Sequence, residues 1–533
     1  MLEALAYNLT GLLIPLLALT AFITPLLDKL APGGRTPSIL ALIGSSIAAI
    51  SSLIILAEVY RSGQPILYKF GGWPPHFGIV YEVDELNALI GACSALIMLA
   101  VTVYSTWYSR HLDEPLWYYI LLVGLEIGIL GCIYTGDVFN LFVMLEVLSV
   151  SAYGLVAYHK NRAEAVEAAA KYALIGAVAT NLYFGALVIL YATHGSLNMG
   201  VLSRIAEEYV AARDALKYAG MIVVAFSLWV FTYKSALFPN HFWLPDAHPE
   251  APTPVSAALS GLVVNVGIYA TMRFLYTIFG PSSYLAGYRE AVLAALFILG
   301  SISGLIGALM MMNQRDVKRL LAYSTISHVG IIYIGLTAGF QAGDTSAVEI
   351  AVAGAIAHII SHSIAKSMLF MASGVFIDSA GSRNMDEMKG VGRLHPLASF
   401  AWITGFLSLA GLPPLLGFYS KLLIYYGYTS MGFLLGSMLV IVVSALSLPG
   451  YFKAIYSVVF GVGRRQFEKV EAGRVEILLA VMALSLLALG AVFPFIEWVF
   501  KDASSSIVTV EGVARYSSRA IEEITIRVLG GGG

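Results

Sequence analysis

The sequence predicts an all-α polytopic membrane protein with about 14 transmembrane helices. The first observation is composition: the 533 residues are 58% hydrophobic and only 12% charged, with a mean hydropathy of +0.80. Such values are typical of a chain buried in lipid and exclude a set of soluble domains. The second is that apolar runs of about 20 residues, the length that crosses a bilayer, recur along the chain. The third is that two of these runs combine prolines with a lysine.

The predicted helices start near residues 8, 38, 85, 115, 137, 167, 217, 252, 288, 318, 348, 397, 432 and 475. The longest polar gaps between them are 61–84, 194–216, 378–396 and 461–474. None of these gaps is long enough for an inserted soluble domain.

Loop charges predict the orientation of the chain. Lys and Arg concentrate in loops after odd-numbered helices, for example at Arg162, Arg319 and Arg383. Because such residues accumulate on the cytoplasmic side, we expect these loops in the cytoplasm and both termini outside. The first apolar run follows Glu3 without a basic segment, so we interpret it as a retained helix and not a cleaved signal.

Two predicted helices are broken by proline. In the seventh, Pro239 follows Lys234 by five residues, and in the twelfth Pro413 and Pro414 precede Lys421. Proline removes a backbone donor and clashes with the preceding turn, so it kinks or interrupts a helix. The two helices are five apart, and an odd offset places two such units in opposite membrane orientations. This arrangement is typical of inverted repeats.

Charged residues lie inside the apolar runs at Glu146, Lys234, Lys366 and Lys421. Each costs about 2.5–3.5 kcal/mol at the bilayer centre on insertion scales, so four cost on the order of 10 kcal/mol. A chain that only needed an apolar core would not carry them. We interpret them as markers of an ion or proton path.

His358, His362 and Lys366 repeat every four residues and share one helical face. A metal site is a poor interpretation, because no carboxylate accompanies the histidines and Lys366 continues the same face. We predict a line of proton-carrying groups; the alternative is histidines that hydrogen-bond to backbone or neighbouring helices. The two cysteines, Cys93 and Cys132, lack metal-ligand spacing, so we expect no metal and no cofactor.

Several stretches resemble one family. They are TGDVFNLFVMLEVLSVSAYGLVAY (135–158), YKSALFPNHFWLPDAHPEAPTPVSAALSG (233–261), RDVKRLLAYSTISHVG (315–330), AHIISHSIAKSMLF (357–370) and LSLAGLPPLLGFYSKLLI (407–424). These segments are similar to the antiporter-like subunits shared by Mrp-type cation/proton antiporters, membrane-bound hydrogenases and respiratory complex I. The segment GGWPPHFGIVYEVDELNAL (71–89) most resembles the D-type Mrp subunit and its hydrogenase counterpart. The resemblance covers about residues 70–460.

The resemblance implies fourteen helices, with helices 4–8 and 9–13 as inverted five-helix units, and polar groups along the membrane midplane. Glu146 matches the family's helix-five glutamate and Lys234 its helix-seven lysine. Lys366 matches the helix-eleven lysine, Lys421 the helix-twelve position, and His328 a position of His or Gln. In the family the glutamate sets the proton affinity of the helix-seven lysine. A static pair that only fixes helix packing is the alternative.

Four further residues are predicted with less direct support. Glu126 and Glu146 lie about ten residues on either side of a short turn, which predicts similar depth and like-charge coupling. Asn265 stands where many relatives carry a helix-eight lysine, and an amide cannot change charge. Asp137 is expected to cap a helix or line an entrance. Lys171 is expected near the cytoplasmic end of helix six, as a relay member or a snorkelling group.

We divide the chain into five parts. These are residues 1–112 with helices 1–3, 113–280 as the first five-helix unit, 281–460 as the inverted second unit, 461–500 with the last transmembrane helix, and 501–533 as a polar C-terminal tail. Within the tail, EGVARYSSRAIEEITIRVL has the pattern of an amphipathic helix, and a frayed end is the alternative.

These observations predict a proton-translocating, antiporter-like subunit of a multisubunit complex in the plasma membrane. The expected partners are other membrane subunits, lipid, protons and Na⁺, and no nucleic acid. One alternative is a cation/proton exchanger subunit of an Mrp assembly, and another is an inert membrane scaffold. No catalytic constellation, Walker A motif or dinucleotide-binding turn occurs, so any redox or ATP chemistry must reside in other subunits.

Overall fold

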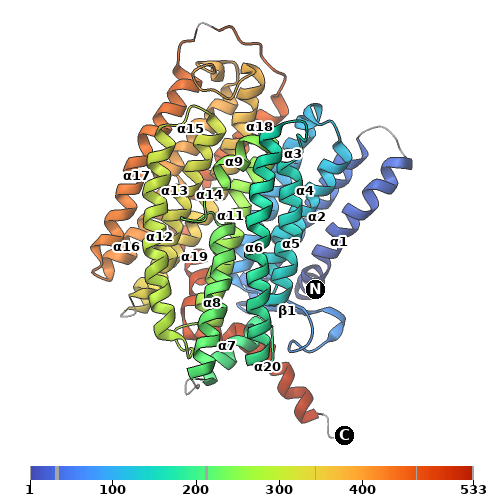
Figure 1. Cartoon of the computed structure of the whole chain (residues 1–533), viewed down its shortest axis with the longest axis vertical. Helices are drawn as coiled ribbons and strands as arrows, with labels where there is room; N and C mark the ends of the chain where they lie inside the picture. The colour runs from blue at the N-terminus through green and yellow to red at the C-terminus, as the bar shows by residue number, and fades with distance from the viewer. Residues whose placement is uncertain (1, 31–34, 210–213, 342–343, 464, 531–533) are drawn as a thin grey trace.

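The computed structural model describes residues 2–30, 35–209, 214–341, 344–463 and 465–530. It is a bundle of helices that mostly run along its long axis (Figure 1). The long helices are α1 Leu2–Leu30, α2 Thr36–Ser62, α3 Glu85–Tyr108, α4 Pro115–Tyr134, α5 Val138–Val156, α6 Ala163–His194, α8 Asp214–Lys234, α12 Ala286–Met312, α13 Val317–Leu336, α14 Thr345–Ala380, α17 Leu434–Ile455 and α18 Gly473–Ala491.

Shorter elements complete the chain. They are β1 Ile66–Lys69, β2 Val80–Val83, α7 Met199–Glu208, α9 Leu244–Glu250, α10 Thr253–Ala258, α11 Val264–Met272, α15 Pro396–Ala410, α16 Leu416–Ser430, α19 Phe493–Val508 and α20 Val510–Gly530. The short helical turns are η1 Phe70–Gly72, η2 Ser109–His111, η4 Leu259–Val263, η5 Arg273–Ile278, η6 Thr337–Phe340, η7 Val391–Leu394 and η8 Tyr456–Phe460.

The predicted all-α membrane fold is confirmed. Thirteen helices in the described part of the chain are long and apolar enough to cross a membrane, and the remaining predicted helix consists of α15 and α16. The continuous span Thr253–Ile278 lies at the centre of the bundle. Every residue of its most apolar window is buried, compared with 33% for α1 at the edge.

Both predicted breaks are present. Helix α8 ends at Lys234, and a non-helical segment containing Pro239 precedes α9. Helix α15 ends at Ala410, Gly411 follows with a φ of 85°, and α16 starts after Pro413 and Pro414. Each break exposes backbone groups next to a buried lysine, which is where discontinuous membrane helices hold their functional groups.

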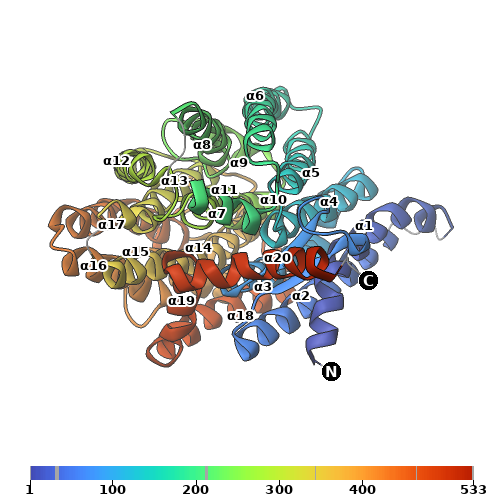
Figure 2. The same cartoon turned by 90° about the horizontal axis from the view of Figure 1, so that it is seen from below.

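One end of the bundle is closed by elements that the sequence pattern did not specify. The polar gap 61–84 forms the antiparallel hairpin β1–β2, and the gap 194–216 contains α7. Helix α18 ends at Ala491, and a separate helix, α19, runs through residue 500, where the predicted tail begins. The predicted amphipathic helix in the tail is confirmed as α20, which crosses this end beside α7 (Figure 2).

Helix α20 covers a buried ion pair. Arg273 and Asp84 are 0% and 1% exposed at their side chains and bind through two hydrogen bonds of 2.6 and 2.8 Å. The guanidinium lies 4.7 Å from the ring centroid of Tyr516 on α20. Arg515 contacts Glu85 at 3.4 Å. The pair is therefore shielded by a segment far along the chain.

A short element occurs once in each predicted five-helix unit. Asp137 caps α5 and forms an isolated antiparallel bridge with Asn198, and Asp316 caps α13 and bridges Asn384 in the same way. The bridging segments read Gly-Ser-Leu-Asn-Met (195–199) and Gly-Ser-Arg-Asn-Met (381–385). Helix α7 after the first lies at the lower end of the molecule, and α15 after the second starts at the upper end (Figure 1). Such a repeat at opposite ends is what the predicted inversion requires; the full repeat stays a prediction.

Candidate functional site: buried charges along the helix bundle

Lys234 ends α8 and has no exposed surface. Its Nζ donates a hydrogen bond to Ser149 Oγ at 2.6 Å. The rings of Tyr153, Tyr172 and Tyr233 lie 5.4, 5.4 and 5.8 Å from Nζ. Aromatic faces attract a cation, so they replace part of the hydration that burial removes. The site can hold a charged lysine with one side-chain hydroxyl as acceptor.

Glu146 lies near Lys234 without contacting it. The two side chains interact electrostatically, but no ion pair joins them in the described chain, and Glu146 Oε1 has no hydrogen-bond partner there. Glu146 shares a face of α5 with Phe139 and Val150, which are 37% and 61% exposed. The carboxylate is therefore partly open on the outward side of the helix, where lipid alone would be a costly neighbour.

Glu126 is fully buried on the other side of this helix pair. Its Oε2 accepts a hydrogen bond of 2.5 Å from Ser45, whose hydroxyl also contacts Thr102 at 3.1 Å. Gly128 packs on the backbone of α5, and a residue two positions away lies on the opposite face of α4. Glu126 therefore faces α2 and α3, and this placement does not favour the predicted coupling to Glu146.

Asn265 connects the central span to α14. Its amide nitrogen donates to Gly261 O and to Ser363 Oγ, both at 2.7 Å, while its oxygen has no described partner. The π-helical turn η4 lies just before it, and such turns often mark functional positions in helices. Asn265 thus contacts the residue next to His362, although an amide cannot carry a charge change.

The second unit contains a continuous hydrogen-bonded group. His328 Nδ1 lies 2.9 Å from His358 Nε2, and His328 Nε2 lies 2.6 Å from Tyr451 Oη. His358 Nδ1 lies 2.8 Å from Ser420 Oγ, in the residue before Lys421. These four residues and the adjacent Lys421 are all buried. Imidazoles both donate and accept protons, so this chain is suited to proton transfer between α13, α14 and α16.

His362 and Lys366 continue along α14. Both ring nitrogens of His362 are buried without a described partner, and its ring centroid lies 5.9 Å from that of His328. Lys366 Nζ donates to Leu321 O at 3.1 Å. The predicted alignment on one helical face is present. However, the hydrogen bonds of His358 connect α14 to the neighbouring helices α13 and α16, and they do not connect His358 to His362 or Lys366.

Lys421 occupies the break between α15 and α16. Its side chain is 7% exposed and Nζ donates to Leu409 O at 2.6 Å, a carbonyl freed where α15 ends. Gly411 makes room for it, since a Cβ there would lie 3.1 Å from Lys421 Cδ. The break therefore supplies both the acceptor and the space for the lysine.

Asp137 and Lys171 lie at the ends of helices. Asp137 accepts hydrogen bonds from the N–H groups of Phe139 and Asn140, which confirms the predicted cap. Burial raises its pKa to about 6 against these two bonds. Lys171 is half exposed, contacts Glu167 at 2.7 Å and Asp246 at 3.4 Å, and lines a surface cavity of about 260 Å³. Lys171 therefore lies at the surface and not among the buried lysines and histidines.

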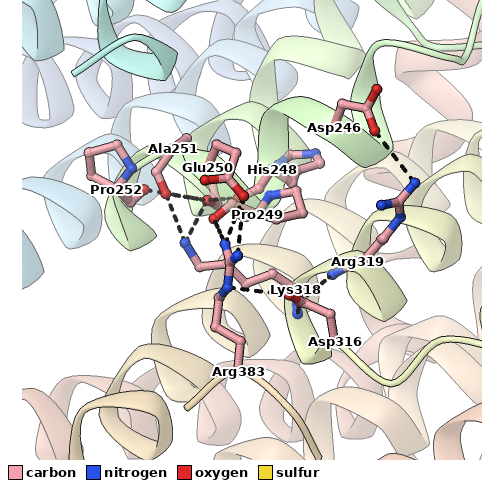
Figure 3. Close-up of polar contacts among 11 residues, drawn as sticks. Asp246, His248, Pro249, Glu250, Ala251, Pro252, Asp316, Lys318, Arg319 and Arg383 are labelled. Carbon is pink, nitrogen blue, oxygen red and sulfur yellow. Dashed lines mark hydrogen bonds and ion pairs between the residues drawn. The ribbon is translucent and has the colours of Figure 1, made fainter. Parts of the chain in front are cut away.

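A cluster of charges surrounds α9 at the end that the loops predict to be cytoplasmic (Figure 3). Arg383 contacts Glu250 at 3.1 Å and Asp316 at 3.3 Å, and Arg319 contacts Asp246 at 3.5 Å. Lys318 points inward and donates to Ala251 O at 2.8 Å. Only 4% of Lys318 is exposed, whereas the side chain of the neighbouring Arg319 is 44% exposed.

Sequence reasoning missed several polar partners in these sites: Ser149, His248, Lys318, Ser420 and Tyr451. Only two carried a usable signal, since Ser149 and Ser420 lie within one turn of a predicted charged residue. The positions of the others depend on the packing of distant helices.

The fold and the buried charges define a class of multi-pass membrane subunits built for ion transport. The chain belongs to the family described as "NADH:quinone oxidoreductase/Mrp antiporter, TM", which matches residues 135–447. It is 33% identical over 416 residues, 78% of this chain and 79% of the relative, to NADH-quinone oxidoreductase subunit N of Desulforudis audaxviator. It is 27% identical over 462 residues, 86% and 88% of the two chains, to a Staphylococcus aureus protein described as antiporter subunit mnhD2.

Solved structures agree with this assignment. A chain of the membrane-bound sulfane sulfur reductase, an archaeal respiratory membrane complex, superposes with a TM-score of 0.84 at 27% identity, covering 95% of this chain and 99% of that one. A chain of the Mrp complex from Dietzia sp. gives a TM-score of 0.80 at 20% identity, with the same coverages. The predicted membership of the antiporter-like subunits is confirmed, and these relatives are subunits of multisubunit membrane complexes.

Proposed function

We propose that this chain translocates protons as the antiporter-like subunit of a multisubunit complex in the plasma membrane, with both termini outside. The observation that carries the proposal is the buried group in which His328, His358 and Ser420 are hydrogen-bonded up to the residue beside Lys421. A group of this kind costs stability, and its members exchange protons readily.

In the first unit, Lys234 is the proton carrier and Glu146 is the group that tunes it. The ammonium has one hydroxyl acceptor and three ring faces, so its proton affinity depends strongly on nearby charge. Glu146 is close enough to act and has a free carboxylate oxygen, so a small movement of α5 changes the interaction. In the second unit, His362, Lys366 and Lys421 extend the path, and Asn265 contributes by holding Ser363 or a water between the units.

Two versions of this function differ in the source of the energy that moves the protons. Relatives occur in respiratory complexes and as an antiporter subunit, so the chain couples proton movement either to redox chemistry in another subunit or to Na⁺ exchange. Likeness to the archaeal respiratory complex favours the redox version. Copurification with an iron–sulfur or nickel–iron module would support it, and isolation with Mrp subunits alone would support the exchanger.

The test uses inverted membrane vesicles that contain the complete complex and a fluorescent pH dye. We expect Lys421→Met and Glu146→Gln each to lower the coupled initial rate by about tenfold or more, as loss of an acid–base group does. Lys171→Met is the matched control, because that lysine is exposed and outside the path. Unchanged rates for both test variants, at equal abundance, would favour an inert scaffold.

A further inference from the structure

A polar cavity of about 510 Å³ opens between the two predicted units, at the end where the charged loops lie. Its lining includes Trp107, His159, Arg162, Glu250, Lys318 and Arg383. Three of its charged side chains are paired: Arg383 contacts Glu250, and Asp378 contacts Arg110 outside the lining. Burial, followed by the positive charges of Arg162 and Lys318, lowers the pKa of His159. We name this cavity the vestibule.

Lys318 forms the inner wall of the vestibule. Although it borders the cavity, only 4% of the residue is exposed, and Nζ donates to Ala251 O at 2.8 Å and Ser256 Oγ at 3.3 Å. Ser256 in turn donates to His248 O at 2.8 Å. The lysine therefore contacts the junction between α9 and α10, where the broken helix continues into the central span (Figure 3).

The imidazole ring of His248, in the same cluster as Lys318, makes no hydrogen bond with any described residue (Figure 3). It is 0% exposed, and neither Nδ1 nor Nε2 has a partner in the described chain. Its ring stacks on Phe370, at 4.9 Å between centroids, and it interacts electrostatically with both Lys318 and Lys366. A buried imidazole with two unpartnered nitrogens and two positive charges nearby is costly unless it exchanges protons or binds water.

We propose that Lys318 and His248 form the proton-loading site of this chain, which takes protons from the vestibule and passes them to Lys366. The inference rests on the proposed function and adds the place where protons enter the path. A proton from vestibule water binds the neutral amine of Lys318. No described hydrogen bond joins the next groups, so each transfer passes through an intervening water: Lys318 gives a proton to one nitrogen of His248, the other nitrogen releases one to Lys366, and His362 receives it next. One proton enters and one leaves. The route reaches Lys366 without passing Asn265.

The alternative is that Lys318 only ties α13 to the α9–α10 junction, and two substitutions separate these roles. Arginine keeps the donor but does not release its proton. A static tie therefore predicts that Lys318→Arg transports normally, and that His248→Gln, which breaks no described hydrogen bond, is silent. A proton-loading site predicts that Lys318→Met, Lys318→Arg and His248→Gln each lower the coupled rate by about tenfold or more.

The experiment uses the vesicles and dye described above, with the abundance of the complex measured for each variant. His241→Gln is the matched control, because this histidine lies in the same broken segment outside the route. Normal transport by His248→Gln or Lys318→Arg would overturn the proposal. If Lys421→Met is also normal, the proposed function fails; if Lys421→Met is impaired, only the entrance is wrong.

A second measurement does not depend on the folding of Lys318 variants. Ser382 lines the vestibule, and Ser382→Cys places a thiol there. A charged, membrane-impermeant methanethiosulfonate should lower the rate several-fold when applied from the cytoplasmic face and have no effect from the other face. Wild-type vesicles, with Cys93 and Cys132, serve as the control for the reagent. An unchanged rate after complete modification of the introduced thiol would contradict an entrance at the vestibule.

Discussion

The two predicted units surround their buried lysines and histidines in different ways. In the first, Lys234 is isolated: one serine hydroxyl and three tyrosine rings surround it, and Glu146 remains at a distance. In the second, His328 and His358 are hydrogen-bonded to each other, to Tyr451 and to Ser420 beside Lys421. A lone charge responds strongly to any neighbouring charge, whereas a hydrogen-bonded chain transmits protons with little change in its surroundings. Under the proposed function, the first unit corresponds to a switching element and the second to a conducting element.

The largest expected effect tests the difference between the two units directly, with one variant in each. Lys234→Met leaves the first unit without a proton carrier, so we expect the coupled rate in vesicles to fall by about a hundredfold. His328→Gln leaves His358, His362 and Lys366 in place, and we expect a loss of about tenfold. Equal losses for the two variants, at equal abundance of the complex, would show that the second unit has no redundancy.

The next effect tests the link from the histidines to Lys421. Ser420→Ala removes the hydroxyl that His358 contacts at 2.8 Å, and we expect a rate loss of about three- to tenfold. Ser408→Ala removes a nearby buried hydroxyl that contacts Ser361 at 3.2 Å and is the matched control. If Ser408→Ala is as severe as Ser420→Ala, the loss reflects general packing and not proton transfer.

A smaller effect concerns the room that the α15–α16 break gives Lys421. Gly411→Ala places a Cβ at a φ of 85° and 3.1 Å from Lys421 Cδ, whereas Gly432→Ala meets no atom within 4 Å at a φ of 71°. Both should destabilise by about 1–2 kcal/mol, the cost of a left-handed alanine. Only Gly411→Ala should also impair transport. Thermal unfolding in detergent and vesicle rates check this, and equal transport by the two variants would contradict it.

An effect on stability alone separates the two capping aspartates by pH. Burial raises the pKa of Asp137 from 3.8 to about 6, so the folded state binds this proton more tightly than the unfolded state. Its contribution to the free energy of unfolding is complete below pH about 4 and is lost as pH rises through about 6, by up to about 3 kcal/mol.

Asp137→Asn should therefore flatten the stability profile of the detergent-solubilised complex between about pH 4 and pH 6. Asp316→Asn is the counterpart in the second unit, and it loses the contact of 3.3 Å with Arg383. We expect this variant to lower the unfolding midpoint at neutral pH. A wild-type profile as flat as that of Asp137→Asn would show that burial of Asp137 carries no such cost.

The parts of the fold that follow from local chemistry were predictable. Pro239 and Pro413 predict the two helix breaks, because proline removes a backbone donor and clashes with the preceding turn, and apolar runs of the right length predict the spans. Proline alone does not decide where a helix ends, since α1 continues through Pro15 and Pro25. The boundary after α18 was not predictable, since α19 is apolar enough to look like its continuation.

The site was predictable for its charged residues and its histidines, but not for most of their partners. Glu146, Lys234, Lys366 and Lys421 stand out against apolar sequence, because each is costly there. Their partners come from elsewhere in the chain: Tyr451 lies 123 residues from His328. The rotation of each helix about its own axis could not be predicted either. In α4 this rotation directs Glu126 toward α2 and α3.

The cover that α20 places over Asp84 and Arg273 also sets an order of events during synthesis. Arg515 contacts Glu85 across 430 residues, and Tyr516 meets Arg273 only after every spanning helix has been made. Chains grow and fold from the amino end, so this end of the bundle stays open until the ribosome has passed residue 516. Damage to α20 should therefore be felt first by the machinery that inserts the chain and joins it to its partners, as a lower yield of assembled complex.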